Sequence, residues 1–212
     1  MTNNLRPTGG PLRIALLASG GGSNARDLIA AAATDPNMEV VGLATDRAGV
    51  GALEIAATAG VPTAVVRLGD YPQRADWDAA LTEAVAEWEP DLVVSVGFLK
   101  LLGRAFLARF GGATLNTHNS LLPAFPGVSG PADALAYGVK LAGATLFVVD
   151  EGVDTGRILA QVAVPVLPGD DVDLLTERIK VAERAQLVRC VAAIAASGSL
   201  DESTWPAAHE RH

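Results

Sequence analysis

The sequence TLNTHNSLLPAFPG, residues 114–127, joins the end of an apolar run to closely spaced polar residues. Asn116, His118 and Ser120 occupy every second position. Side chains two apart in extended backbone point to the same side. We therefore expect an amide, an imidazole and a hydroxyl to share one face at the end of a buried strand. The prolines and the glycine that follow predict a loop of defined shape instead of a further regular element.

A second informative stretch lies near the start of the chain. Residues 12–18, LRIALLA, form a nearly continuous apolar run, which is typical of a strand buried on both faces. The glycine-rich segment SGGGSN follows at residues 19–24, and ARDLIAAAA then has helix propensity. A strand, a glycine loop and a helix in this order direct free backbone N–H groups toward an anion.

Alternating patterns continue through the first half of the chain. They predict strands at residues 38–45, 62–68 and 91–96 and helices at residues 50–60 and 72–88. Such alternation indicates an α/β fold with an open, mostly parallel sheet and helices on both faces. Ligands bind beyond the carboxyl ends of the strands in these sheets. We therefore expect the loops at residues 19–24, 97–102 and 116–127 to converge.

The second half of the chain has a different pattern. It predicts a short helix at residues 131–137, and strands at residues 141–149 and 158–166 that flank an acidic turn, residues 150–156. A hairpin-like pair of this kind makes the sheet mixed. A last helix is expected at residues 171–196, with its apolar side formed by Leu174, Ile179, Ala182, Leu187 and Val188. We expect one domain at residues 12–198, a disordered tail at residues 1–11 and a C-terminal tail at residues 199–212.

Composition limits the classes of function. Half of the 212 residues are hydrophobic and 19% are charged, as in a globular protein with a substantial core. Sixteen basic and 24 acidic residues give a formal charge of −8, which disfavours nucleic acid and membrane surfaces as partners. The chain shows no signal pattern and no apolar run of membrane-spanning length, so we expect a cytoplasmic protein that acts on small molecules. The single cysteine, Cys190, is expected in the core.

The glycine loop has two functional interpretations. Gly20-x-Gly22-x-x-Ala25, together with Asp46 after the second strand, fits a relaxed dinucleotide fingerprint and would indicate an NAD-dependent dehydrogenase. The other interpretation is a phosphate site for a mononucleotide-like substrate. A tight turn with a purely structural role is a third possibility.

The residues around His118 suit acyl transfer. An amide and an imidazolium can stabilise the oxyanion that forms when a nucleophile attacks a carbonyl, and a nearby carboxylate favours the protonated imidazole. Ser120 lacks the sequence context of a serine nucleophile. The sequence contains no cysteine cluster that would indicate a metal site. The alternative is that His118 is a loop histidine without a catalytic role.

Two segments carry a resemblance to a known family. The sequence NTHNSLLP, residues 116–123, and DEGVDTG, residues 150–156, resemble the folate-dependent formyltransferases, and the resemblance covers roughly residues 12–198. SGGGSN and GVKLAGATLFVVDEGVDTG, residues 138–156, resemble most the members that formylate glycinamide ribonucleotide in purine synthesis. The resemblance implies a Rossmann-like sheet of about seven strands. It also implies 10-formyltetrahydrofolate as co-substrate and an amine as acceptor. We expect a monomer or a homodimer.

The resemblance also implies roles for individual residues. The catalytic set would be Asn116, His118 and Asp154. The ribonucleotide would be bound by Gly22, Ser23, Asn24 and Glu183. The folate would be bound by Arg74, Leu99, Lys100, Leu101, Leu102, Asn116, Asp150, Glu151, Gly152 and Val153. No metal is implied.

Four departures from the family pattern concern the acceptor more than the chemistry. Asn119, Phe147 and Arg157 replace residues usual in the family, and Val128-Ser129-Gly130-Pro131 replaces a segment that usually carries histidine. Alternative acceptors are therefore another amine, such as an amino-sugar nucleotide, or water in a formyltetrahydrofolate deformylase. A tRNA acceptor is disfavoured by the acidic balance and by the absence of a further C-terminal domain.

Overall fold

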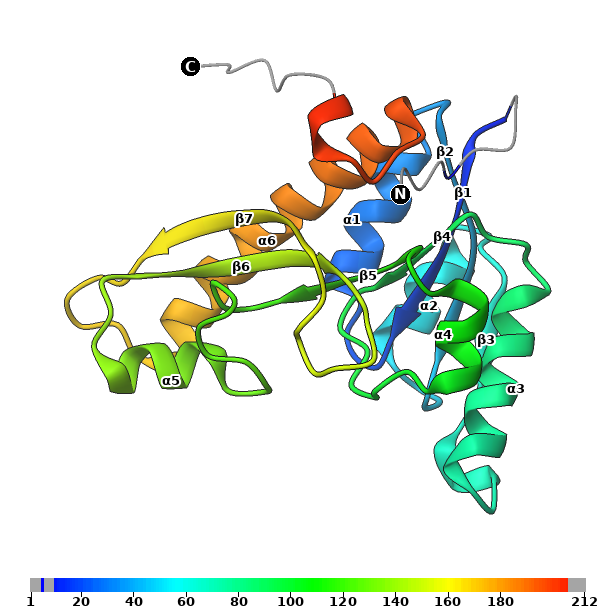
Figure 1. The fold of residues 1–212 in the computed structure, drawn as a ribbon, viewed down its shortest axis with the longest axis horizontal. Coiled ribbons are helices and arrows are strands. Elements are labelled where there is room, and N and C mark those ends of the chain that lie inside the picture. Colours follow the sequence, from blue (N-terminus) through cyan, green and yellow to red (C-terminus); the bar gives the residue numbers. More distant parts are fainter. Residues whose placement is uncertain (1–4, 6–9, 206–212) are drawn as a thin grey trace.

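The computed structural model describes Leu5 and residues 10–205, and it places one seven-stranded sheet at the centre of the molecule (Figure 1). The strand order is β3-β2-β1-β4-β5-β6-β7. The strands are β1 Leu12–Ala18, β2 Met38–Thr45, β3 Thr63–Val65, β4 Leu92–Ser95, β5 Thr114–His118, β6 Leu141–Val148 and β7 Ile158–Pro165. β1 to β5 pair in parallel, whereas β6 pairs antiparallel with both β5 and β7. The expected mixed α/β sheet is confirmed.

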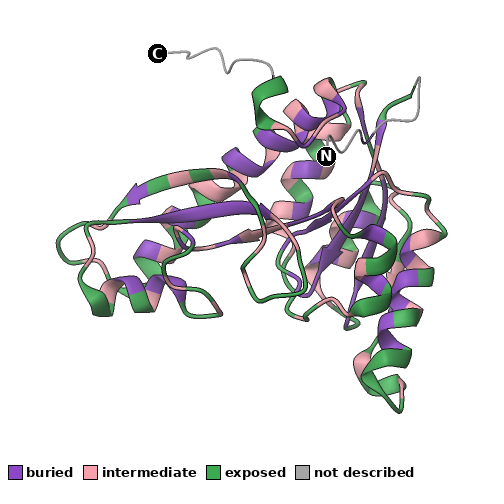
Figure 2. Ribbon diagram, in the orientation of Figure 1, coloured by how far each residue is buried: buried purple, intermediate pink, exposed green. Residues whose placement is uncertain are grey.

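Helices cover both faces of the sheet. They are α1 Ser23–Ala32, α2 Gly51–Thr58, α3 Arg74–Ala86, α4 Arg104–Phe110, α5 Gly130–Tyr137 and α6 Val172–Ser197. Short 3₁₀ turns lie at Leu68–Asp70 and Glu202–Thr204. The strands form the continuous buried layer, and each helix buries one side (Figure 2).

The alternation of side chains along β1 sorts the core into two layers. Leu12, Ile14 and Leu16 pack with residues of α1, α2 and α6. Ala15 and Leu17 point the other way and pack with residues of α3 and α4. Successive strand residues face opposite sides, so a strand covered on both faces must be apolar at nearly every position, as LRIALLA is.

The C-terminal half forms a third cluster. α5, the outer strands β6 and β7 and the first half of α6 pack together around Leu175 and Ile179. The prediction that Leu174 faces the core is wrong, because this residue is 56% exposed and Leu175 is buried instead. Asp171 accepts a hydrogen bond from the backbone N–H of Leu174 as the N-cap of α6. The residue after Leu174 therefore begins the buried side.

Parts of both expected tails contact the core. Leu5 is buried, and its N–H donates to the carbonyl of Gly198 at 2.9 Å. Leu200 is buried and Trp205 packs against the same cluster. The other residues of the predicted tails, 1–4, 6–9 and 206–212, lie outside the described residues.

Two further expectations concern Cys190 and membranes. Cys190 is buried as expected, and burial raises the pKa of its thiol to about 11. Among the helices of the described residues, none has the length and apolarity needed to cross a membrane.

Candidate active site

His118 is the last residue of β5 and lies where the parallel part of the sheet meets the antiparallel part. Its cross-strand partner on β6 is Thr145. Asn116, two residues earlier on the same face, lies between Ser95 on β4 and Phe147 on β6. The structure thus places the amide and the imidazole on one face at a strand end, as the alternation predicts. The expectation that the Ser120 hydroxyl shares this strand face is wrong, because β5 ends at His118.

Two oxygen acceptors surround the buried imidazole. Nε2 of His118 lies 3.0 Å from the carbonyl oxygen of Phe125, and Nδ1 lies 3.8 Å from Oδ2 of Asp154. The second distance is an ion-pair contact and is too long for a hydrogen bond. Asp154 Oδ2 also accepts a hydrogen bond from the Gly127 N–H at 2.8 Å. Both ring nitrogens of His118 therefore face oxygen atoms of the protein.

Both acceptor residues hold an unusual backbone conformation. Phe125 has φ 54° and Asp154 has φ 55°, in the left-handed region. For L-residues this region costs on the order of 1–2 kcal/mol. Backbone strain of this size persists where the surrounding structure fixes it, and such positions are concentrated at functional sites.

Side-chain hydrogen bonds fix the loop after β5. The Thr145 hydroxyl donates to the Ser120 carbonyl at 2.7 Å and accepts from the Leu122 N–H at 3.0 Å. The Ser120 hydroxyl donates to the Ala124 carbonyl at 2.7 Å. Ser120 is therefore a structural part of the loop, in agreement with the expectation that it is not a nucleophile.

The glycine loop places the N-terminus of α1 at the same edge of the sheet. Gly22 is the N-cap of α1 with φ 78°, and a Cβ atom there would lie 2.6 Å from Cα of Ala52. A glycine has no side chain to accept from the N–H groups of the first helical turn. A helix N-terminus of this kind is suited to an anion.

Glu183 on α6 reaches this end of α1. Its Oε1 atom accepts a hydrogen bond from Nδ2 of Asn24 at 3.1 Å. Burial raises the pKa of Glu183, and this effect outweighs the opposing effects of the Asn24 hydrogen bond and of the charges of Arg184, His118 and Lys180. The structure therefore brings two of the expected ribonucleotide residues into contact from opposite ends of the chain.

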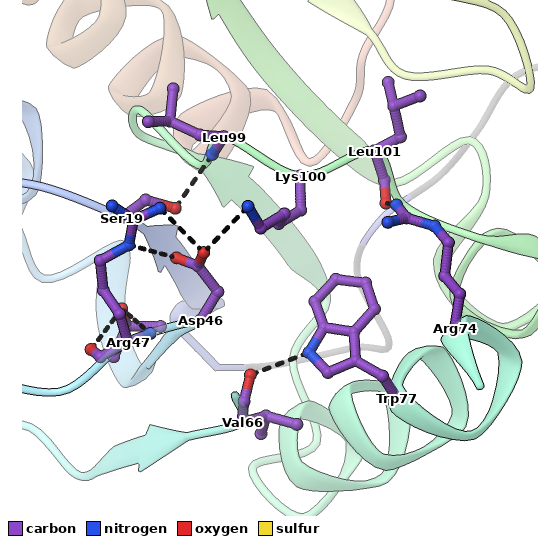
Figure 3. A network of polar contacts seen from close by, with 10 residues as sticks. Ser19, Asp46, Arg47, Val66, Arg74, Trp77, Leu99, Lys100 and Leu101 are labelled. Atoms are coloured by element: carbon purple, nitrogen blue, oxygen red, sulfur yellow. Dashed lines mark hydrogen bonds and ion pairs between the residues drawn. The ribbon is translucent and has the colours of Figure 1, made fainter. Parts of the chain in front are cut away.

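A polar network links the glycine loop to the segment after β4 (Figure 3). The Ser19 hydroxyl accepts from the Leu99 N–H at 3.0 Å, and Lys100 Nζ lies 3.6 Å from Oδ2 of Asp46. Burial of Asp46 acts to raise its pKa, but hydrogen bonds from Ser19 and Arg47 and the charges of Arg47 and Lys100 lower it overall. Leu99 and Leu101 are exposed.

The acidic turn between β6 and β7 borders a cavity of about 500 Å³. Asp150 and Glu151 line the cavity together with Val148, Val149 and Arg157. The opposite wall is formed by α4 and the two glycines after it, through Arg104, Leu107, Ala108, Gly111 and Gly112. Inside the turn, Oδ1 of Asp150 accepts from the Gly152 N–H at 3.0 Å and the Thr155 hydroxyl at 2.8 Å, while Val153 is exposed.

The wall formed by α4 was not predicted. No helix is predicted at residues 104–110, because a seven-residue helix such as RAFLARF gives little periodic signal. Phe106 and Phe110 are both buried, and this apolar pair is the sequence signal that could have indicated the helix.

Comparison with known proteins identifies the family of this site. The model of the formyl transferase family matches residues 12–191. The chain is 58% identical over 192 residues to the phosphoribosylglycinamide formyltransferase of Mycobacterium tuberculosis, which covers 91% of this chain and 89% of the relative. The chain belongs to the formyl transferase family.

Two more relatives of this formyl transferase are informative. The solved structure of phosphoribosylglycinamide formyltransferase from Brucella melitensis has a TM-score of 0.83 and 39% identity, covering 88% of this chain and 96% of that one. The trifunctional purine biosynthetic protein adenosine-3 of Drosophila pseudoobscura is 42% identical over 191 residues, which are 89% of this chain and 14% of that protein.

The dehydrogenase alternative conflicts with the surroundings of Asp46. The carboxylate of Asp46 is 3% exposed and pairs with Arg47 at 3.1 Å and with Lys100. A carboxylate that reads the ribose of a dinucleotide must be free to accept from its hydroxyls. In this formyl transferase Asp46 instead interacts with Ser19, Arg47 and Lys100, which follow the strands β1, β2 and β4.

The residues that depart from the family pattern have different surroundings. Phe147 is buried beside Asn116, and Val128 is 94% exposed. Arg157 donates to the Leu200 carbonyl at 3.2 Å and pairs with Glu202 at 3.1 Å. Gly130 begins α5, and a Cβ atom there would lie 2.8 Å from the Asn119 carbonyl oxygen.

Proposed function

We propose that this formyl transferase moves the formyl group of 10-formyltetrahydrofolate to the amine of N1-(5-phospho-D-ribosyl)glycinamide, a step of de novo purine synthesis leading to IMP. The observation that carries the proposal is the ion-pair contact between His118 and Asp154. His118 lies at the end of β5, the strand that also holds Asn116. The high identity to phosphoribosylglycinamide formyltransferase over most of both chains supports this choice of acceptor.

The reaction joins the amine nitrogen to the formyl carbon and breaks the bond from that carbon to N10 of the folate. The carbonyl oxygen carries a negative charge in the tetrahedral intermediate. The side-chain N–H of Asn116 would donate to this oxygen, and His118 in its protonated form would stabilise the charge electrostatically. The Asp154 carboxylate would orient the imidazole ring. The amine loses a proton and N10 gains one, so Asp154 and His118 would also assist the transfer of that proton.

The ribonucleotide phosphate would bind at the N-terminus of α1. Gly22, Ser23 and Asn24 supply backbone N–H groups there, and the helix dipole favours an anion. Glu183 is held beside Asn24 and would accept from hydroxyl groups of the ribose.

The folate would lie at the acidic turn, partly in the cavity between this turn and α4, and would extend from there to Asn116 and His118, which do not line the cavity. Asp150 and Glu151 line this cavity, and Gly152 and Val153 continue the turn. A volume of about 500 Å³ lies in the range of small-molecule sites. Residues Leu99–Leu102 would contact the rest of the folate, because this segment leads directly into α4. Arg74 would contact the folate as well.

Isotope tracing tests the proposed acceptor. Purified protein is incubated with 10-formyltetrahydrofolate labelled in the formyl carbon and with glycinamide ribonucleotide. We expect the label on the ribonucleotide amine. Label in free formate would identify water as the acceptor, and no transfer to the ribonucleotide or to water would direct the search to amino-sugar nucleotides, the alternative that the unusual residues 128–131 suggest.

A further inference from the structure

The first turns of α3 contact the chain repeatedly between β4 and α4. The ring of Trp77 lies parallel to that of Phe98, with centroids 6.3 Å apart. The guanidinium of Arg74 lies 5.3 Å from the Trp77 ring centroid and donates to the Leu101 carbonyl (Figure 3). Trp77 is itself fixed by a hydrogen bond from its Nε1 to the Val66 carbonyl at 2.8 Å. α3 therefore supports the segment that leads into α4.

Asp78, next to Trp77, holds the end of this segment. Its Oδ1 atom accepts from the Gly103 N–H at 2.7 Å. Its Oδ2 atom accepts from the N–H groups of Ala105 at 2.8 Å and Phe106 at 3.3 Å. α4 begins at Arg104 with Gly103 as its N-cap. A carboxylate on one helix thus caps the N-terminus of another, where a negative charge is favourable.

Gly103 permits this contact because it has no side chain. A Cβ atom at Gly103 would lie 2.5 Å from Cγ of Asp78 and 2.6 and 2.7 Å from its two carboxylate oxygens. Only a glycine lets the carboxylate come this close to the backbone. Asp78 is 3% exposed, so water does not readily replace the bonds that it accepts.

The capped helix forms one wall of the cavity. Arg104, Leu107, Ala108 and Gly111 line the cavity from α4, opposite Asp150 and Glu151. The segment just before the cap is Leu99–Leu102. A carboxylate that fixes the junction at Gly103 therefore determines the position of both the segment and the wall.

We propose that Asp78 is a positioning residue for the folate: it holds the junction of the Leu99–Leu102 segment and α4 in the geometry that binds the co-substrate. It acts through backbone N–H groups and does not touch the substrates. This inference rests on the proposed function, which places the folate against these two elements. The ribonucleotide residues at α1 and α6 lie on the opposite face of the sheet from α3 and α4. Ser19 is the contact between the glycine loop and the Leu99–Leu102 segment, so loss of the cap should affect the folate more than the ribonucleotide.

The test compares Asp78→Ala, Asp78→Asn and Gly103→Ala with the control Asp76→Ala, an exposed carboxylate of the same helix. Steady-state kinetics give KM for each substrate, and calorimetric titration with tetrahydrofolate gives binding without turnover. We expect Asp78→Ala to raise KM for the folate by about tenfold and KM for the ribonucleotide by less than about twofold. Asp78→Asn keeps one acceptor oxygen and is expected to raise the folate KM by about threefold.

A wild-type folate KM in the Asp78 and Gly103 variants would overturn the inference. An equal rise of both KM values would also overturn it, because that result indicates general loosening of the structure. If Asp78→Ala does not fold, Asp78→Asn and Gly103→Ala carry the test with the same expected selectivity. If the wild-type protein transfers no formyl group, the proposed function fails, and the tetrahydrofolate titration decides the role of Asp78 separately.

Discussion

Nδ1 of His118 lies 3.8 Å from Oδ2 of Asp154, and the two residues come from different elements, the end of β5 and the turn between β6 and β7. We predict that His118→Ala and Asp154→Asn each lower kcat by a factor on the order of 10²–10⁴. Folate binding should change little, because both side chains are assigned to the transition state. Steady-state kinetics and tetrahydrofolate titration measure the two effects.

The control for this prediction is Glu54→Gln, which makes the same kind of change at an exposed position of α2. It should leave kcat at the wild-type value. Wild-type turnover in either His118→Ala or Asp154→Asn would remove that residue from the catalytic set.

Gly22→Val should weaken the ribonucleotide more than the folate. Gly22 has φ 78° and a Cβ atom there would lie 2.6 Å from Ala52 Cα, so valine must move the loop that caps α1. The expected result is a selective rise in KM for the ribonucleotide of about tenfold or more. Gly69→Ala, at a position with open space around the added Cβ, is the control. Equal weakening of both substrates would place the phosphate elsewhere.

Glu183→Gln is expected to stabilise the folded protein at pH 7 and to weaken binding of the ribonucleotide. Burial raises the pKa of Glu183, so the charged form is disfavoured in the folded protein. The corresponding stability is present below the ordinary pKa of 4.5 and is lost as pH rises through the raised pKa. Glutamine keeps an acceptor for Asn24 without the charge. The variant should therefore melt at a higher temperature than wild type at pH 7, and this difference should vanish below about pH 4.

The kinetic effect of the same substitution should be a higher KM for the ribonucleotide with a nearly unchanged KM for the folate. A variant that melts below wild type at pH 7 would contradict the electrostatic part of this account. An unchanged ribonucleotide KM would contradict the assigned contact.

Asp170→Asn tests a second carboxylate, far from the chemistry. Its two oxygens accept from Arg178 at 2.7 Å each, and the Leu167 N–H donates to Oδ2 at 2.8 Å. The hydrogen bond from Arg178 is the main cause that lowers the Asp170 pKa from 3.8 to about 2. The stability from this contact is thus present above pH 3.8 and is lost as pH falls through about 2.

Chemical denaturation at several pH values measures this effect. Asp170→Asn should be less stable than wild type at pH 7, and the difference should shrink as pH falls from about 4 to about 2. Asp133→Asn, an exposed carboxylate at the start of α5, serves as the control. A difference that is constant over this pH range would show that Asp170 contributes by packing alone.

Most of the fold could be predicted because buried parallel strands have a strong local signal. LRIALLA was predicted at residues 12–18 and β1 has these bounds. The signal failed where structure depends on distant residues. α4 is capped by Asp78 from α3, and no local pattern around Gly103 contains that information. Trp88 was placed in a helix that ends at Ala86, and its ring instead fills the space over Gly42.

The site was predictable to different degrees. Alternation alone placed Asn116 and His118 on one face, and the structure agrees. Asp154 could not be found by spacing, because it lies in the turn between β6 and β7 and reaches His118 only through the tertiary structure. Resemblance to the family supplied it. The roles of the catalytic and ribonucleotide residues remain predictions, which the variants at His118, Asp154, Gly22 and Glu183 test. The roles of the individual folate residues also remain predictions.

The most direct test of the central claim is a spectroscopic assay of formyl loss from 10-formyltetrahydrofolate by the wild-type protein, run with and without glycinamide ribonucleotide. The account predicts loss of the formyl group only when the ribonucleotide is present. Equal loss in its absence, or no loss in its presence, would contradict the account.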